Sequence, residues 1–281
     1  MPGLFQPVIR TTRSLVAALC GLLVVSGADA RPHRVVSLNL CTDELVLMLA
    51  DRSDIAGLSP LAADCTLSVL CLSAQGLPVV PANGERLLGA RPDLVVSGTF
   101  GADRARAVAG TAGIATLAVA PATTLDDVPR QITTVAHALG QDARGASLIA
   151  AFRSRLRALA MPVTNEAPRA VMLDANAYSA GPGTLADSVM QISGFRDAGS
   201  GARLSLERLV AEPPDLLIRD ASPAAPSLAE AIADHPALRA RFGRDRMAIV
   251  PGNLLLCALP QSLDAVALLE QARKALPRGH S

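Results

Sequence analysis

Residues 85–96 read ERLLGARPDLVV, and residues 207–218 read ERLVAEPPDLLI. Both segments open with Glu-Arg-Leu, and in both Pro-Asp-Leu leads into an apolar run at the same distance from the glutamate. A helix that stops at proline, a turn at aspartate and a following strand would explain each copy locally. The matched register over the whole segment favours an internal repeat, so we expect two related halves.

Short apolar runs alternate with helical patterns around both copies of the repeat. The first half predicts strands at residues 34–38, 55–58, 93–97 and 114–119 and helices at residues 42–50, 85–90 and 103–112. The second half predicts strands at residues 170–173, 215–218 and 247–250 and helices at residues 184–193, 206–211, 227–233 and 261–276. Such alternation is typical of parallel sheets, so the predicted fold class is α/β, with two open lobes and central, mostly parallel sheets.

Residues 125–160 carry no strand pattern and separate the two halves. Val128, Ile132 and Val135 recur at helical spacing, and Gly140 suits a left-handed helix cap. The next apolar stripe predicts a single long helix over residues 142–160, which would join the lobes.

The first thirty residues have the pattern of a secretion signal. Arg10 and Arg13 precede the apolar stretch 15–25, and residues 28–30 (Ala-Asp-Ala) fit a cleavage site. That stretch is shorter than the about 20 residues that span a membrane. The predicted organisation is a signal peptide at 1–30, an N-terminal lobe at 31–141, an interlobe helix at 142–160 and a C-terminal lobe at 161–281.

The amino-acid composition indicates which residue types form the core and which class of partner is excluded. The 281 residues are 50% hydrophobic and 18% charged, but they include no Trp and one Tyr, so the core must be aliphatic. The formal net charge is +1 and no long basic run is present, so we expect no nucleic-acid partner.

Cys41, Cys65, Cys71 and Cys257 follow the predicted signal peptide. Export would place them in an oxidising compartment, and four cysteines allow three pairings. Cys65 and Cys71 lie in one predicted loop and are close enough for a local disulfide. Cys41 and Cys257 could face one another, form a bridge or act as small apolar residues, and the sequence does not choose between these.

Five segments in this order resemble a known family. They read RVVSLNLCTDEL at 34–45, ERLLGARPDLVV at 85–96, YSAGPGTLADSVMQISGF at 178–195, ERLVAEPPDLLI at 207–218 and CALPQSLDAVALL at 257–269. From residue 34 to about residue 276 the chain resembles the periplasmic substrate-binding proteins of ABC importers for iron chelates and cobalamin. The resemblance implies two lobes on one rigid helix, a ligand cleft between them, a monomer in the periplasm and no enzyme activity.

The resemblance also implies which residues meet the ligand and the importer. The predicted ligand-binding residues, in loops after strands or beside the last helix, are Asn39, Leu40, Cys41, Ser59, Thr99, Phe100, Tyr178 and Cys257. Tyr178 could instead be a core residue with a satisfied hydroxyl. Glu85 and Glu207 are expected to dock on arginines of the permease dimer at the inner membrane, although each would also suit the start of its own helix.

The ligand is expected to be a small metal chelate. Haem and cobalamin present flat faces that aromatic side chains cover well, and only Phe100 and Tyr178 are available. This scarcity favours an iron–siderophore chelate, with cobalamin, another corrinoid or haem as alternatives. Arg104, Arg203 and Arg219 are candidates for contacting an anionic chelate.

Metal and enzyme sites are weakly supported. His33, His137, His235 and His280 stand at no metal-ligand spacing, so we predict no metal site and no cofactor, and any iron should arrive chelated. An exported enzyme with Cys41 as nucleophile is the alternative class, but no catalytic residues are predicted, because no histidine partner is recognisable. At residues 181–184, a helix cap by Thr184 is favoured over an anion site.

Overall fold

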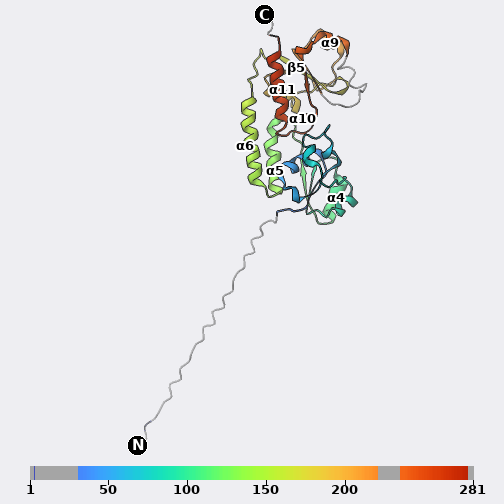
Figure 1. Cartoon of the computed structure of the whole chain (residues 1–281), viewed down its shortest axis with the longest axis vertical. Coiled ribbons are helices and arrows are strands. Elements are labelled where there is room, and N and C mark those ends of the chain that lie inside the picture. The colour runs from blue at the N-terminus through green and yellow to red at the C-terminus, as the bar shows by residue number, and fades with distance from the viewer. Residues whose placement is uncertain (1–2, 4–30, 221–234, 278–281) are drawn as a thin grey trace. The chain divides into compact units, whose positions relative to one another are not determined.

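The computed structural model describes residue 3, residues 31–220 and residues 235–277 (Figure 1). The chain separates into two units between Ala30 and Arg31, and every element described below belongs to the second unit. The predicted signal peptide, apart from Gly3, and the predicted helix at 227–233 lie outside the described residues. Within the described ranges, no helix is both long enough and apolar enough to span a bilayer.

The first sheet has four parallel strands in the order β2-β1-β3-β4. They are β1 (Val35–Ser37), β2 (Ile55–Gly57), β3 (Leu94–Gly98) and β4 (Ala115–Val119). Val35 and Val96 pack into one apolar cluster, and their neighbours Val36 and Val95 pack into another, so both faces of the sheet are covered. The covering helices are α1 (Leu40–Leu49), α3 (Gly84–Gly89), α4 (Asp103–Thr111) and α5 (Val128–Ala138).

The second sheet repeats this topology with the order β6-β5-β7-β8, again all parallel. Its strands are β5 (Arg169–Leu173), β6 (Arg196–Asp197), β7 (Leu216–Asp220) and β8 (Met247–Val250). The helices around it are α7 (Leu185–Ile192), α8 (Leu206–Ala211), α9 (Pro236–Arg241), α10 (Asn253–Leu256) and α11 (Ser262–Ala275). The predicted fold class is confirmed, and the repeat that predicted it places α3 before β3 and α8 before β7.

The aspartate of each repeat copy has the same structural task. Asp93 accepts hydrogen bonds from the backbone N–H groups of His33 and Arg34, at 2.7 and 3.0 Å, where β1 begins. Asp215 accepts one from the backbone N–H of Arg169, at 2.8 Å, at the start of β5. Each carboxylate therefore ties its own strand to the neighbouring central strand, which explains why aspartate stands at this place in both copies.

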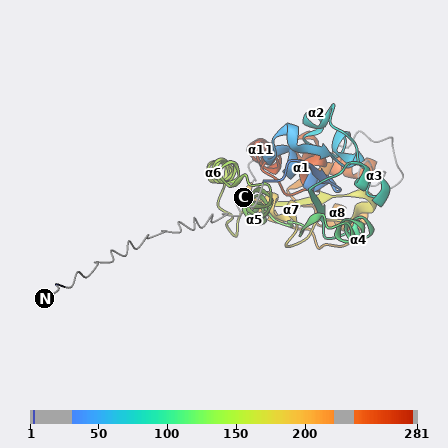
Figure 2. The ribbon, with the colours of Figure 1, turned by 90° about the horizontal axis from the view of Figure 1, so that it is seen from below.

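Helix α6 (Asp142–Leu159) connects the halves and packs against both α5 and α11, which lie on the same side of it (Figures 1 and 2). Gly145 allows the close approach to α5, since a Cβ there would lie 2.5 Å from the Cβ of Ala136. Towards α11, Arg155 donates to Asp264 at 2.5 Å. The helix was predicted over 142–160 and is observed over 142–159, whereas the proposed lobe boundaries stay predictions.

Some local predictions were wrong. The helix expected from Thr42 begins at Leu40, because the Asn39 side chain caps it by accepting from the N–H groups of Cys41 and Thr42, at 3.1 and 3.4 Å. The sequence also missed several short elements, which lack room for a periodic pattern. They are α2 (Cys71–Ala74), β6, α9 and α10.

Candidate functional site

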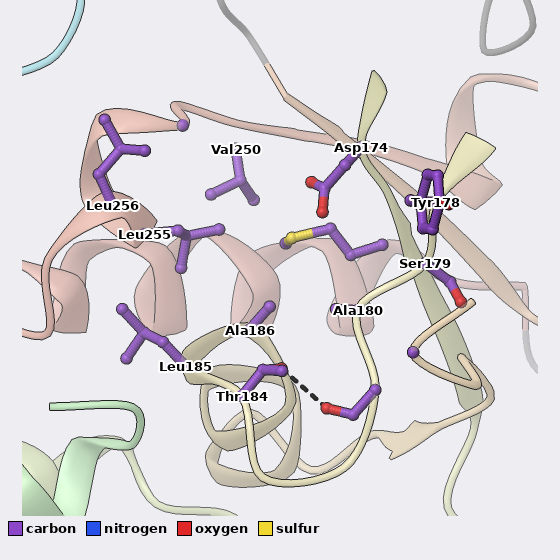
Figure 3. A pocket seen from close by; sticks show the side chains of 14 residues that line it. Asp174, Tyr178, Ser179, Ala180, Thr184, Leu185, Ala186, Val250, Leu255 and Leu256 are labelled. Carbon is purple, nitrogen blue, oxygen red and sulfur yellow. Dashed lines mark hydrogen bonds between the residues drawn. The ribbon is translucent and has the colours of Figure 1, made fainter. Parts of the chain in front are cut away.

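A cavity of about 490 Å³ opens at the carboxyl end of the second sheet, and we name it the C-lobe cavity. Asp174 and Tyr178 lie at one end, and Leu255 and Leu256 lie across the space from them (Figure 3). Its lining residues are Met172, Asp174, Tyr178, Ser179, Ala180, Gly181, Thr184, Leu185, Ala186, Gly201, Val250, Gly252, Leu255 and Leu256. The wall is mainly aliphatic, with a few polar groups that could orient a ligand.

A second cavity of about 120 Å³ lies at the carboxyl ends of β3 and β4, and we name it the N-lobe cavity. Its lining residues are Asn39, Cys41, Thr42, Leu45, Gly98, Thr99, Phe100, Val119, Ala120, Pro121, Ala122, Gln131, Leu256 and Ala258. Leu256 lines both cavities, so the two half-sites adjoin at α10. Parallel α/β sheets commonly bind ligands beyond the carboxyl ends of their strands.

One aromatic side chain is exposed at each half-site. Phe100 is 75% exposed and Tyr178 is 51% exposed, unusually open for large apolar groups. The turn before Tyr178 puts Asn176 and Ala177 in the left-handed region, at φ values of 58° and 56°, which is strained for alanine. Arg203 supports that turn by donating through Nε to the carbonyl of Asn176 at 2.9 Å. The fold therefore holds Tyr178 outward at a conformational cost.

The structure brings together most of the predicted ligand residues. Asn39, Cys41, Thr99 and Phe100 line the N-lobe cavity, and Tyr178 lines the C-lobe cavity. The remaining predicted residues line neither cavity: Leu40 is buried in the core, the Ser59 hydroxyl donates to Asp43, and Cys257 is buried in a disulfide. Their contact with a ligand stays a prediction.

Sequence reasoning missed several residues of the C-lobe cavity. Asp174 directly follows β5, so the rule that ligands bind at strand ends would have identified it. Leu255 and Leu256 lie in α10, a single turn whose pattern is too short to recognise. Gly181 and Gly201 carry no side-chain signal at all.

The two cavities lack the arginine side chains that were candidates for contacting an anionic chelate. Neither is lined by a lysine or an arginine, and Asp174 is the charged residue in their walls. The arginine candidates Arg104, Arg203 and Arg219 lie outside both linings, and Arg203 supports the turn described above. An anionic ligand would therefore meet no basic side chain from the linings of these two cavities.

The cysteines form two disulfides. Cys65 pairs with Cys71 inside one loop, and Cys41 pairs with Cys257 across 216 residues of sequence. The second bond joins α1 of the first half to the residue after α10 in the second half. Because Cys41 is oxidised, it offers no thiolate, and the thiol-enzyme alternative is wrong.

The family follows from the sequence match and this geometry together. A family described as "Periplasmic binding protein" matches residues 35–241, which include the whole first sheet and strands β5, β6 and β7 of the second. The chain belongs to the periplasmic binding protein family. Members of this family bind solutes, and membership implies a periplasmic location.

Similar proteins differ in the ligands that their names give. A cobalamin-binding protein of Halobacterium salinarum (strain ATCC 29341 / DSM 671 / R1) is 28% identical over 205 residues, which are 69% of this chain and 55% of that protein. This chain thus spans about half the length of the curated relatives it matches. Among solved structures, the periplasmic heme-binding protein BhuT in complex with two hemes is 25% identical, with a TM-score of 0.69 over 87% of this chain and 99% of that chain. The vitamin B12 binding protein BtuF of Vibrio cholerae is 18% identical and shows the fold alone, with a TM-score of 0.63 over 87% and 97%.

In this periplasmic binding protein, Glu85 and Glu207 occupy equivalent places. Each is the second residue of its helix, α3 or α8, and each is exposed. Asn83 and Ser205 cap these helices by accepting from Arg86 and Arg208. The pKa of Glu207 is lowered by hydrogen bonds from its own backbone N–H and from Ser205. Both lobes therefore present one glutamate in the same local setting.

The loop at residues 181–184 serves mainly as a helix cap, as predicted. The Thr184 hydroxyl accepts from the N–H of Asp187 at 3.2 Å, and the Asp187 carboxylate accepts from the N–H of Gly183 at 2.8 Å. With that amide occupied, the loop offers little to an anion. Elsewhere in the described ranges, no cluster of three or more His, Cys, Asp or Glu residues is placed to hold a metal ion.

Two adjacent carboxyl groups are buried beneath the N-lobe half-site, in the first turns of α1. Burial raises the pKa of Asp43 to about 6, although Ser37 and Ser59 oppose it with hydrogen bonds. Burial likewise raises the pKa of Glu44 to about 7, against hydrogen bonds from Ser68 and Val69. Each group attaches a loop to α1, and each favours its protonated form more strongly than it would in the unfolded chain.

We therefore expect the free energy of unfolding to fall as pH rises from about 4 to about 8. The folded protein binds more protons than the unfolded chain in that window, and the raised pKa values correspond to on the order of 3 kcal/mol per carboxyl group. Glu44→Gln and Asp43→Asn should each flatten the pH profile, measured by urea unfolding at pH 5 and pH 8. The exposed Glu212→Gln should leave the slope unchanged, and an unchanged slope in both buried variants would contradict the assignment.

Proposed function

We propose that this chain is the substrate-binding component of an ABC importer and that it captures a corrinoid, such as cobalamin, without chemical change. The observation that carries the proposal is the pair of adjoining, largely aliphatic half-sites, each with an exposed aromatic ring and neither with a basic residue. A corrin presents a broad apolar face edged with neutral amides. Phe100 and Tyr178 can cover the face, Asp174 and the side-chain carbonyl of Gln131 can accept hydrogen bonds from the amides, and the side-chain NH2 of Asn39 can donate to an amide carbonyl.

The charge of the cavity walls supports this ranking over the other chelates. Haem carries propionates and many siderophores are polyanionic, so both would gain from arginine or lysine in the wall. A ferric siderophore remains the second candidate where its charge is neutral, as in a ferric trihydroxamate. The relative named a cobalamin-binding protein supports the same order.

The second step of the proposed function is delivery of the bound ligand to the permease. The protein is proposed to act as a monomer in the periplasm after removal of residues 1–30. Glu85 and Glu207 are proposed to dock on basic residues of the two permease subunits, since each lobe exposes one glutamate at an equivalent place. Such rim charges guide association and fix orientation more than they add affinity.

Titration with cyanocobalamin, a ferric trihydroxamate, a ferric catecholate and haem tests the ligand assignment. We expect cyanocobalamin to bind most tightly, and Tyr178→Ala or Phe100→Ala to weaken its binding by at least about fivefold each, because each ring contributes roughly 1 kcal/mol of stacking beyond the area it buries. Calorimetry gives these affinities directly. Leu72→Ala is the control, since Leu72 is exposed and lines neither cavity. Tight binding of the catecholate alone would reject the corrinoid.

A further inference from the structure

Leu256 is the residue that the two half-sites share, and its side chain lies outside the core cluster that buries Leu254 of the same turn. It is 53% exposed and belongs to α10, a single turn with no side-chain cap. Among the backbone bonds at this turn, the N–H of Leu254 donates to the carbonyl of Pro251 at 3.1 Å and the N–H of Leu255 donates to the carbonyl of Gly252 at 2.8 Å. An isolated turn of this length is unstable without other support.

Leu254 anchors the turn in the core, and two further contacts come from the other half of the chain. The Cys41–Cys257 disulfide attaches the end of α10 to α1, and the Asn253 side chain donates to the carbonyl of Cys65 at 3.2 Å. Cys257 is also held from its own lobe, where its carbonyl accepts from the Ser262 hydroxyl at 3.1 Å. The turn is therefore fastened at both ends to the N-terminal half.

The N-terminal end of this cross-link is rigid. Asn39 caps α1 on the N–H groups of Cys41 and Thr42, and the Thr42 hydroxyl donates back to the carbonyl of Asn39 at 2.9 Å. The Thr42 hydroxyl also lies 2.8 Å from the hydroxyl of Ser37, in the buried strand β1. These contacts hold Cys41 in place against the first sheet. The disulfide therefore restrains α10 rather than α1.

We propose that the Cys41–Cys257 disulfide is a positioning element of the ligand site, which holds α10 so that Leu256 stands between the two half-sites. Without the bond, an exposed leucine on a single turn is expected to move towards either apolar cavity and fill space that the ligand needs. Because the disulfide holds Leu256 in place before the ligand arrives, less conformational entropy is lost when the ligand binds. The effect on affinity rests on the proposed function, but the effect on α10 does not.

Hydrogen–deuterium exchange of the mature chain tests the positioning without any ligand. In Cys41→Ala/Cys257→Ala we expect amides of residues 251–259 to exchange at least tenfold faster, while β5 and α6 keep their protection. The control is Val80→Ala, which removes a buried side chain from a core cluster that contains no residue of α10 and should change exchange at 251–259 by less than threefold. Unchanged exchange at 251–259 in the first variant would overturn the proposal.

If Cys41→Ala/Cys257→Ala loses protection from exchange throughout the chain, a third variant still tests the proposal. Asn253→Ala removes only the hydrogen bond to Cys65 and keeps the disulfide. Exchange at 251–259 within threefold of the native rate supports the disulfide as the restraint, whereas a tenfold increase shows that the hydrogen bond fixes α10 and overturns the proposal.

Cyanocobalamin titration then separates this inference from the proposed function. If the native chain binds cyanocobalamin, the Cys41→Ala/Cys257→Ala variant should bind it at least tenfold more weakly, and the Val80→Ala variant should bind it within threefold of the native affinity. Equal affinity in the first variant counts against a positioning role. If no variant binds cyanocobalamin but exchange at 251–259 rises as expected, the corrinoid assignment fails and the restraint on α10 stands.

Discussion

We expect import of cyanocobalamin to fall to background when Glu85 and Glu207 are both replaced by lysine, while affinity for the ligand stays within twofold of the native value. Both glutamates are exposed on short helices, and neither lines a cavity. The reversal turns two proposed attractions to permease arginines into two repulsions, and like-charge juxtaposition in an interface costs several kcal/mol. Uptake of labelled cyanocobalamin by cells with the cognate permease measures the effect, beside calorimetry on the purified variant.

A helix-dipole penalty must be separated from the loss of docking. A lysine near a helix start costs about 0.3–1 kcal/mol, whatever surface the helix lies on. The matched control is Asp126→Lys/Asp142→Lys, which reverses two other exposed acids in the first turns of helices. It should import normally, and the single reversals at Glu85 and Glu207 should show intermediate uptake. Native uptake in the Glu85→Lys/Glu207→Lys variant would defeat the docking proposal.

The sequence predicted most of the fold because its signals are local and repeated. Helix-to-strand connectors such as residues 85–96 contain a proline, a turn aspartate and an apolar run, each with its own physical cause. The structure adds the reason for the aspartate: Asp93 and Asp215 bind the first amides of a neighbouring strand. That partner lies 46 to 60 residues away along the chain, so no local pattern contains it.

The candidate site was harder to predict because it depends on contacts that are distant in sequence. Cys41 and Cys257 pair across 216 residues, and nothing near either one chooses this pairing over the alternatives. Asp43 and Glu44 look like ordinary exposed acids of an amphipathic helix, yet the loops that bind them bury both. Tyr178 was identified because it follows a predicted strand in a segment that resembles the family, whereas Leu256 is one of many leucines in an aliphatic chain.

Gly181→Ala should abolish the C-lobe half-site. A Cβ at residue 181 would lie 2.4 Å from the backbone nitrogen and 2.6 Å from the Cα of Gly201, across two loops that both line the C-lobe cavity. Neither backbone atom can move aside as a side chain can, so the loops must separate. We expect cyanocobalamin affinity to drop at least tenfold and the free energy of unfolding to drop by about 1–3 kcal/mol, as for other overpacked sites.

Two further glycines show whether the clash itself is responsible. Gly201→Ala places its Cβ no closer than 3.9 Å to the same loop but demands a φ of +68°, so it adds backbone strain of roughly 1–2 kcal/mol without pushing the loops apart. Gly110→Ala, in α4 with nothing within 4 Å, should gain about 0.5–1 kcal/mol. Calorimetry and urea unfolding on all three variants then compare affinity with stability. If affinity is lost in Gly181→Ala but kept in Gly201→Ala, the contact between the two loops shapes the ligand site; native affinity in Gly181→Ala would mean that the ligand binds elsewhere.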